Sequence, residues 1–221
     1  MRIYIKLSKN KELIPFNNQH LLTAALHRWL GKDNELHDKQ SLYCFSWLQN
    51  VKTGSKGVSL TDESYFFISA HDDDFIKKVI KGIMEDSYAF CGSSVVDVMI
   101  KYAPEFESNH RFMLSSPVLV KQKLEGQRKF NYMIYSDEGF EDVLTQNLKT
   151  KMRIANIEDE GVEVKLDKTF IKAHTKLIDY KGVFNKVSVC PVIISGTPEQ
   201  IAFAWSVGLG YSTGIGFGSL K

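Results

Sequence analysis

Ser206-Val-Gly-Leu-Gly-Tyr-Ser-Thr-Gly-Ile-Gly-Phe-Gly-Ser-Leu-Lys221 holds five glycines within eleven positions, namely Gly208, Gly210, Gly214, Gly216 and Gly218. Glycine is favoured where the backbone takes a positive φ or where another group must come close. A cluster this dense predicts a loop whose main-chain N–H groups point at a ligand, and a phosphate is the ligand such loops suit best. Because Ile215 and Phe217 alternate with glycines, we expect a short final strand rather than a flexible tail.

The residues just before this loop predict a helix over 197–207. Thr197 is a suitable N-cap, Pro198 suits the first turn, and Glu199 suits the positive end of the helix dipole. A Walker phosphate-binding loop is excluded, because no register of the glycines is followed by the required Gly-Lys-Ser/Thr. The expected pattern is therefore helix, glycine-rich loop and short strand.

The composition is that of a folded protein in water. The chain has 221 residues, with 43% hydrophobic and 24% charged residues, which suits two domains of about 100 residues each. Its apolar runs fall short of the ~20 residues of a membrane span, and the first residues lack a signal-peptide core. We therefore expect a cytoplasmic protein without membrane contact.

The cysteines and the net charge give weaker information about ligands. Cys44, Cys91 and Cys190 are scattered and form no CxxC pair, so we expect neither a bound metal nor another cofactor. The net charge of +2 permits nucleic-acid binding without requiring it.

Hydrophobic periodicity predicts the same order of elements in both halves of the chain. In the first half we expect strands at 2–7, 41–48, 65–69 and 93–102, with helices at 18–30 and 72–85. In the second half we expect strands at 111–123 (broken near Pro117), 129–136, 162–166, 170–179 and 187–194, with helices at 141–154 and 197–207. The order β-α-β-β-α-β is that of a ferredoxin-like fold. We predict an α+β protein of two tandem ferredoxin-like domains, 1–108 and 109–221.

Five stretches, in order, resemble the CRISPR-associated endoribonucleases of the Cas six type. The terminal glycines are similar to the family's glycine-rich motif. Residues 13–22 resemble the start of the family's first helix, and residues 42–46 resemble its second strand. Residues 113–118 resemble the start of its second domain, and residues 140–151, with Asn147 and Lys151, resemble the next helix. The resemblance covers nearly the whole chain.

The resemblance implies an enzyme that cleaves CRISPR repeat RNA without a metal ion to give mature guide RNAs. In this family the 2′-hydroxyl attacks the adjacent phosphate and leaves a 2′,3′-cyclic phosphate and a 5′-hydroxyl. The implied partners are the repeat RNA and other subunits of a CRISPR interference complex, with the protein as a monomer or homodimer.

Two histidines occupy positions where the family places catalytic groups. His27 stands on the first helix, and His37 stands in the connection after it. Histidine suits proton transfer at neutral pH, and each such group contributes roughly 10²–10⁴-fold to the rate. The resemblance implies His37 as base and His27 as acid or as a group that positions the phosphate, and the assignment is reversible. The family's stabilising lysine corresponds most closely to Lys39, with Lys52 or Lys56 as substitutes.

The resemblance also implies residues that bind RNA. The glycine loop would use its amides with the hydroxyls of Tyr211 and Ser212, although Ser212 replaces a lysine common in the family's motif. A basic hairpin carries Lys121, Lys123, Arg128 and Lys129, and a second basic strip carries Lys149, Lys151 and Arg153. Each of these cations is also compatible with an ordinary solvated surface position.

Two other functions stay open from the sequence. One is a non-catalytic RNA-binding subunit of a CRISPR interference complex, which would keep the glycine loop without the chemistry. The other is a metabolic enzyme of ferredoxin-like fold that binds a small phosphate or nucleotide in a deep pocket.

Overall fold

The first half forms one four-stranded antiparallel sheet with two helices on one face. The computed structural model describes residues 1–31, 40–123 and 130–221, with only the backbone described for Lys123. The elements of the first half are β1 (Arg2–Leu7), α1 (Gln19–Leu30), β2 (Tyr43–Phe45), β5 (Tyr65–Ala70), α2 (Asp73–Glu85) and β6 (Val95–Lys101). The strand order β2-β5-β1-β6 is that of a ferredoxin-like fold, as predicted.

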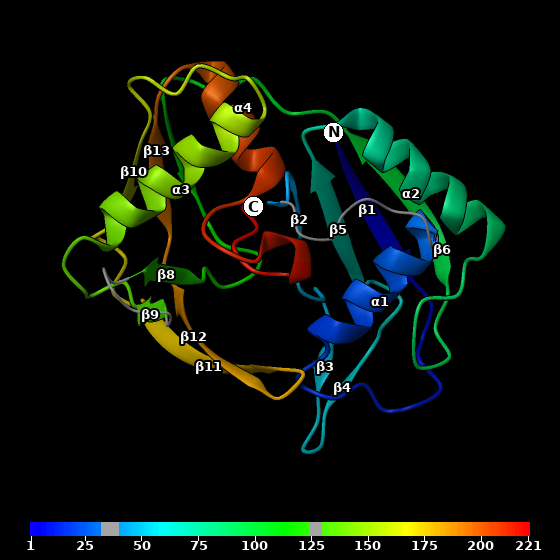
Figure 1. The fold of residues 1–221 in the computed structure, drawn as a ribbon. Helices are drawn as coiled ribbons and strands as arrows, with labels where there is room; N and C mark the ends of the chain where they lie inside the picture. The colour runs from blue at the N-terminus through cyan, green and yellow to red at the C-terminus, as the bar shows by residue number, and fades with distance from the viewer. Residues whose placement is uncertain (32–39, 124–129) are drawn as a thin grey trace.

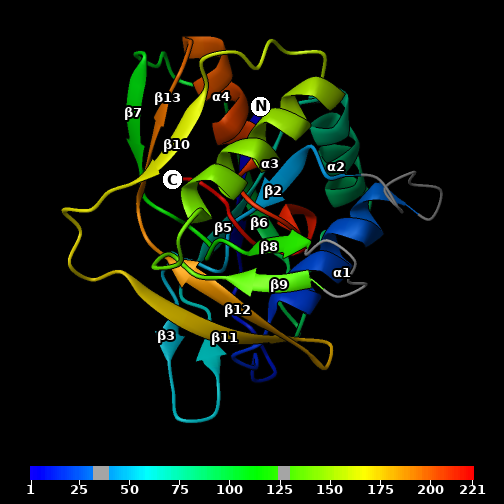
Figure 2. The same cartoon turned by 60° about the vertical axis from the view of Figure 1, so that its left-hand side comes forward.

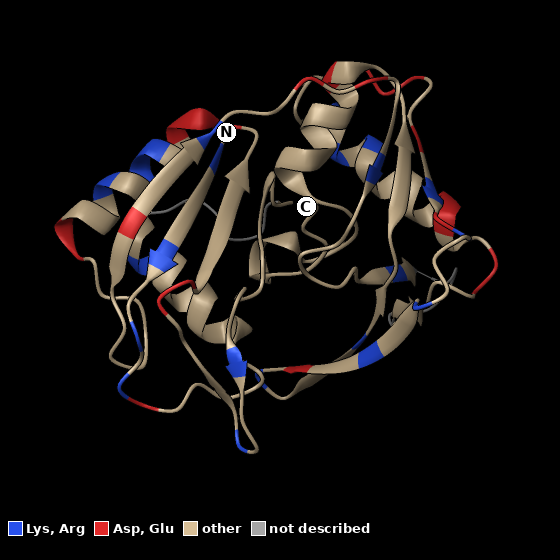
Figure 3. Ribbon diagram, turned by 180° about the vertical axis from the view of Figure 1, so that it is seen from behind, with Lys and Arg blue, Asp and Glu red and all other residues tan. Residues whose placement is uncertain are grey.

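Alternation of apolar residues explains why the helices cover a single face of this sheet. Ile3, Ile5 and Leu7 of β1 are buried beneath α1 and α2, and Figure 3 shows the uncovered strands from the other side. Helix α2 begins where the side chain of Asp72 accepts a hydrogen bond from the N–H of Asp74, an N-cap arrangement. A short hairpin of β3 (Lys52–Thr53) and β4 (Val58–Ser59) extends below the sheet.

The second half repeats this order with a smaller sheet. It contains β7 (Asn109–Phe112), α3 (Phe140–Ile154), β10 (Glu163–Leu166), β13 (Val192–Ser195) and α4 (Pro198–Val207). Its antiparallel sheet has the order β10-β13-β7, and the fourth strand is reduced to a bridge between Leu114 and Leu220. Thr197 and Gln200 form a capping box at the start of α4, which confirms the predicted helix start.

Two hairpins project from the second half. One pairs β8 (Val120–Lys123) with β9 (Phe130–Met133), and the other pairs β11 (His174–Tyr180) with β12 (Val183–Val189). Figures 1 and 2 show β11 and β12 as a curved ribbon whose turn reaches the first half of the molecule near α1. We call this pair the β11–β12 ribbon.

The structure confirms the predicted break near Pro117, which separates β7 from β8, and corrects two other predicted strands. The strand expected at 187–194 divides into β12 and β13. Pro191 lies at the second break, where it has no N–H to offer a neighbouring strand. The final strand is absent; residues Thr213–Ile215 form the 3₁₀ turn η1 instead, flanked by positive φ angles at Ser212 and Gly216.

The two halves pack directly against each other. Arg2 of β1 is 1% exposed, and its guanidinium carbon lies 3.9 Å from the ring centroid of Phe67 and 3.7 Å from that of Trp205. The same guanidinium donates to the carbonyl oxygens of Trp205 (2.8 Å) and Leu220 (2.9 Å). Among the described residues, no helix is long and apolar enough to cross a membrane.

Candidate functional site

The glycine-rich segment lies in the middle of the molecule, between the two halves (Figure 1). Its two ends are joined by a hydrogen bond from the N–H of Leu209 to the carbonyl of Gly218, at 2.8 Å. The segment is attached to residues 117–119 by bonds of 2.8 Å from Tyr211 N–H to the Leu119 carbonyl and from Gly218 N–H to the Pro117 carbonyl. The result is a closed loop, 208–218, held in a fixed conformation; we call it the glycine loop.

Close packing explains two of its glycines. Gly218 has a φ of +65°, and a side chain there would overlap the carbonyl of Leu209. A side chain at Gly214 would meet the hydroxyls of Ser41 and Tyr43. These glycines allow the loop to fold on itself and to lie against the first half of the chain.

The expectation that all five glycines present their N–H groups to a phosphate is wrong for three of them. The N–H of Gly208 donates to Ala204 (2.9 Å), that of Gly216 to Thr213 (3.2 Å), and that of Gly218 to Pro117 (2.8 Å). All three glycines are buried. In the described part of the chain, the N–H groups of Ser212, Thr213 and Gly214 at the tip of the loop make no backbone hydrogen bond. Ser212 is half-buried, whereas Thr213 and Gly214 are buried.

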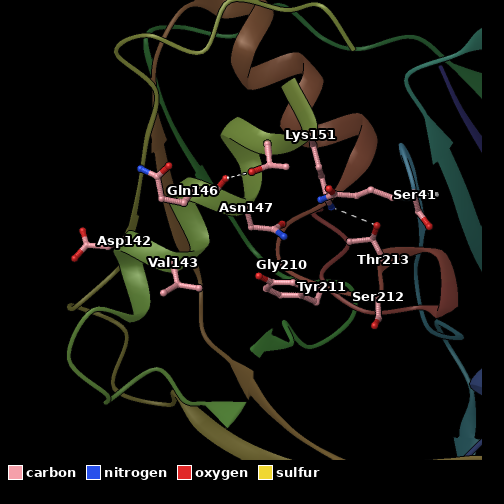
Figure 4. A pocket seen from close by; sticks show the side chains of 12 residues that line it. Ser41, Asp142, Val143, Gln146, Asn147, Lys151, Gly210, Tyr211, Ser212 and Thr213 are labelled. Carbon is pink, nitrogen blue, oxygen red and sulfur yellow. Dashed lines mark hydrogen bonds between the residues drawn. The ribbon is translucent and has the colours of Figure 1, made fainter. Parts of the chain in front are cut away.

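Lys151 lies beneath the glycine loop, which corrects its predicted place in a surface strip. The side chain comes from α3, is 2% exposed, and donates to the carbonyls of Gly208 (3.1 Å) and Val207 (3.4 Å) and to Oγ1 of Thr213 (3.3 Å). Figure 4 shows its ammonium reaching Thr213. Burial lowers the pKa of Lys151 to about 7. The side chain of Lys151 therefore supports the loop from inside.

A pocket of about 500 Å³ joins the first helix to the tip of the glycine loop. His27, which is half-buried, lines it from α1. We call it the His27 pocket; its other lining residues are Thr23, Ala24, Ser41, Tyr43, Tyr180, Lys181, Ser212, Gly214 and Ile215. The pocket brings together four segments that are far apart in the sequence.

Three residues of the His27 pocket were missed in the sequence. Tyr43 is 5% exposed, and burial raises its pKa to about 12; its hydroxyl donates to the Gly214 carbonyl at 3.4 Å. Tyr180 and Lys181 lie at the turn of the β11–β12 ribbon. The turn is visible in the sequence as Lys181-Gly182, but its approach to α1 depends on the curvature of the ribbon.

A second pocket, of about 650 Å³, lies between α3 and the glycine loop (Figure 4). It shares Ser41 and Ser212 with the His27 pocket, so the two adjoin at the loop tip. We call it the α3 pocket; its remaining lining residues are Gln40, Asp142, Val143, Gln146, Asn147, Thr150, Lys151, Gly210, Tyr211 and Thr213.

The other predicted site residues do not line these pockets or cannot be placed. His37, Lys39, Arg128 and Lys129 lie outside the described residues. Lys121 is half-buried on β8, with its Nζ 5.3 Å from the ring centroid of Tyr132, and Lys123 follows on the same strand. Lys52 and Lys56 lie on and near the β3–β4 hairpin.

Exposed cations follow the β11–β12 ribbon. Lys176, Lys181 and Lys186 are exposed and, within the described ranges, form no salt bridge. On α2, by contrast, Lys77 pairs with Asp74 at 2.7 Å and Lys81 with Glu85 at 3.8 Å. Figure 3 shows both groups of basic residues on the ribbon diagram. Unpaired positive charge therefore lies along the ribbon whose turn lines the His27 pocket.

The fold and the site define an α+β protein of two tandem ferredoxin-like units with a glycine loop and two adjoining pockets between them. The sequence profile of the family "CRISPR associated protein Cas6, C-terminal" matches residues 100–221, more than half of the chain. The chain therefore belongs to the Cas6 family of CRISPR-associated proteins.

Individual relatives match along the whole chain. CRISPR-associated endoribonuclease Cas6 1 of Methanocaldococcus jannaschii is 25% identical over 236 residues, which cover 99% of this chain and 91% of that protein. The endoribonuclease-like protein Cas6nc of Pyrococcus horikoshii is 24% identical over 244 residues, covering 100% of this chain and 99% of that protein.

Solved structures confirm the fold. A Cas6-related protein of Pyrococcus furiosus superposes with a TM-score of 0.86 at 24% identity, covering 100% of this chain and 97% of that one. A protein described as a RAMP protein binding different RNA substrates gives the same TM-score at 20% identity, with 100% and 98% coverage.

Proposed function

We propose that this protein is an endoribonuclease that cleaves CRISPR repeat RNA to produce mature guide RNAs. The observation that supports this most directly is the His27 pocket, where a histidine of the first helix lies opposite the tip of the glycine loop. The family assignment and the name of the Methanocaldococcus relative support the same activity.

The proposed reaction needs no metal ion. The 2′-oxygen of the ribose forms a bond to the adjacent phosphorus, and the bond from phosphorus to the 5′-oxygen breaks. One histidine accepts the 2′-hydroxyl proton, and the other gives a proton to the leaving 5′-oxygen. We assign these roles to His37 and His27 in that order. The products are a 2′,3′-cyclic phosphate and a 5′-hydroxyl.

The pocket also offers groups that can stabilise the negative charge of the transition state. The N–H groups of Ser212 and Gly214 lie at the loop tip, and Lys181 lines the same pocket from the β11–β12 ribbon. Preorganised donors of this kind stabilise charge as it develops on the phosphate. Lys181 is thus a candidate for the cation that stabilises the transition state, a role for which the family resemblance indicated Lys39.

Incubation of the protein with repeat RNA in EDTA tests the proposal. We expect a single cut with a cyclic phosphate end, and a rate that falls by about 10²-fold or more in His27→Ala and in His37→Ala. Affinity for uncleaved RNA should stay within a few-fold. A matched decrease in rate and affinity in either variant would assign that histidine to binding rather than proton transfer.

The second candidate is a non-catalytic RNA-binding subunit of a CRISPR interference complex. It is favoured by the match to Cas6nc, which is named only as endoribonuclease-like. Tight binding of repeat RNA that stays intact in the same incubation would decide for this candidate. Size-exclusion chromatography with and without RNA would distinguish a monomer from a homodimer.

A further inference from the structure

The α3 pocket differs in chemistry from the His27 pocket beside it. Its volume of about 650 Å³ lies within the usual range for small-molecule sites, roughly 300–1,000 Å³. Its wall combines the amide side chains of Gln146 and Asn147, the hydroxyl of Thr213 and the ring of Tyr211. Figure 4 shows the Tyr211 ring and the Asn147 amide next to each other on the loop side of α3.

Asn147 is the observation that points to a ligand. Its side chain is 6% exposed, and within the described part of the chain its Oδ1 is buried without a hydrogen-bond partner. Leaving a buried acceptor unpaired destabilises the folded protein, and an apolar residue at this helix position would avoid that cost. The terminal amide torsion of asparagine is soft, so a small rotation presents the amide to a donor inside the pocket.

The charge of the lining favours a nucleobase over a phosphate. The Lys151 ammonium already donates to three oxygens beneath the loop, and Asp142 adds a carboxylate at the other end of the pocket. Carboxamides match the adjacent donors and acceptors on the edges of bases. An aromatic ring such as that of Tyr211 stacks favourably on an unpaired base.

The position of the pocket determines which base it can hold. Ser41 and Ser212 line both pockets, so a chain whose phosphate lies in the His27 pocket has its neighbouring nucleotide at the α3 pocket. Resting on the proposed function, we propose that the α3 pocket binds the base of a nucleotide flanking the scissile phosphate. Asn147 reads the edge of this base, and Tyr211 stacks on it.

Short RNAs test this inference when the two nucleotides that flank the cut are each varied over the four bases and an abasic residue. We expect wild-type kcat/KM to differ at least tenfold between the best base and the abasic residue at one of these positions. In Asn147→Ala the same ratio should fall below threefold, and the abasic substrate should be cut at nearly the wild-type rate. Asn17→Ala, an exposed asparagine outside both pockets, should keep the wild-type ratio.

Gln146→Ala and Tyr211→Leu provide further variants should Asn147→Ala fail to fold, and either should lower the same ratio. Uniform loss on every substrate, or full discrimination in all folded variants, would overturn the subsite while leaving cleavage in place. If wild-type protein cuts none of the RNAs, the proposed function fails instead. The subsite is then tested by binding, with the ratio of affinities between the best base and the abasic residue in place of the ratio of kcat/KM.

Discussion

At the scale of single residues, Lys151 shows how a charge is held inside the protein. Its ammonium is surrounded by two carbonyl oxygens and one hydroxyl, which favour the charged form, while burial favours the neutral form and lowers the pKa to about 7. The neighbouring thiol of Cys44 has its pKa raised to about 11 by burial. Near neutral pH, Lys151 is therefore the group here that changes charge.

This predicts a specific dependence of stability on pH. Between pH 7 and about 10.5 the unfolded chain binds a proton at Lys151 that the folded chain has lost, so the free energy of unfolding rises with pH in this window. Relative to Lys151→Met, the wild-type free energy of unfolding should rise by about 1–2 kcal/mol between pH 7.5 and 9. Urea unfolding at several pH values measures this rise, with Lys149→Met as the control. If the free energies of unfolding of wild type and Lys151→Met change in parallel with pH, burial does not lower the pKa of Lys151.

At the scale of elements, the glycine loop depends on close backbone contacts. Gly218 combines a positive φ with contact to the Leu209 carbonyl, so neither the backbone conformation nor the space admits a side chain. Gly54, on the β3–β4 hairpin, has an ordinary contact at 3.5 Å for a built side chain.

We expect Gly218→Ala to destabilise the protein by at least about 2 kcal/mol, because strain and steric overlap act together. In a chain of this length that corresponds to a decrease in Tm of about 4–8 °C. Gly54→Ala should change Tm by less than about 2 °C, since surface substitutions are usually close to neutral. Thermal unfolding of both variants compares them directly, and equal changes would mean that the loop tolerates rearrangement.

The β11–β12 ribbon is the element that brings positive charge to the His27 pocket. Lys181 lies at its turn beside α1 and, among the described ion pairs, has no acidic partner. A lysine that contacts a phosphate of single-stranded RNA releases roughly 0.7 of a counterion.

Lys181→Ala should therefore weaken RNA binding and reduce the slope of log affinity against log salt by about 0.7. Lys78→Ala, on the outer helix α2, removes the same charge at an exposed position away from both pockets and should leave the slope unchanged. Affinities measured across a salt series with uncleavable RNA give both slopes. An unchanged slope for Lys181→Ala would place the RNA backbone elsewhere.

At the scale of the whole molecule, Arg2 connects the two halves. Its guanidinium is stacked between Phe67 of one half and Trp205 of the other and donates to two carbonyls of the second half. A planar guanidinium can stack and donate in this geometry, whereas an ammonium cannot. Arg2 therefore fixes β1 and β5 of the first half against α4 and the C-terminal residues of the second half.

Arg2→Ala should destabilise the protein by about 3 kcal/mol, because it leaves two carbonyls unpaired and a cavity between two rings. Arg2→Lys should recover less than half of this loss. Arg28→Ala is a control within the first half, where the side chain is 37% exposed and lies beside Asp86; its effect should be smaller. Chemical unfolding of the three variants tests this, and a full recovery by lysine would show that stacking is not what joins the halves.

Local patterns in the sequence were sufficient for the order of elements. Alternation in β1 and the cap residues Asp72 and Thr197 act within a few residues of themselves, so their effect can be read without a structure. The break near Pro117 was also predicted from the sequence, whereas the break at Pro191 was not, because it depended on which neighbouring strands β12 and β13 could reach. Likewise, His27 could be expected near the glycine loop only through the family resemblance.

The amino-acid pattern alone settled the α+β class, the repeated ferredoxin-like order and the presence of a tight glycine loop, because periodicity and glycine content act locally. Folding in three dimensions decided the rest: which loop amides face inward, that Lys151 supports the loop from below, and that Lys181 and Tyr180 reach the histidine of α1. The position of Lys151 depends on contacts with residues 56 to 62 positions away, and the ribbon turn reaches α1 from still farther along the chain. Such contacts leave no signal in the neighbouring sequence.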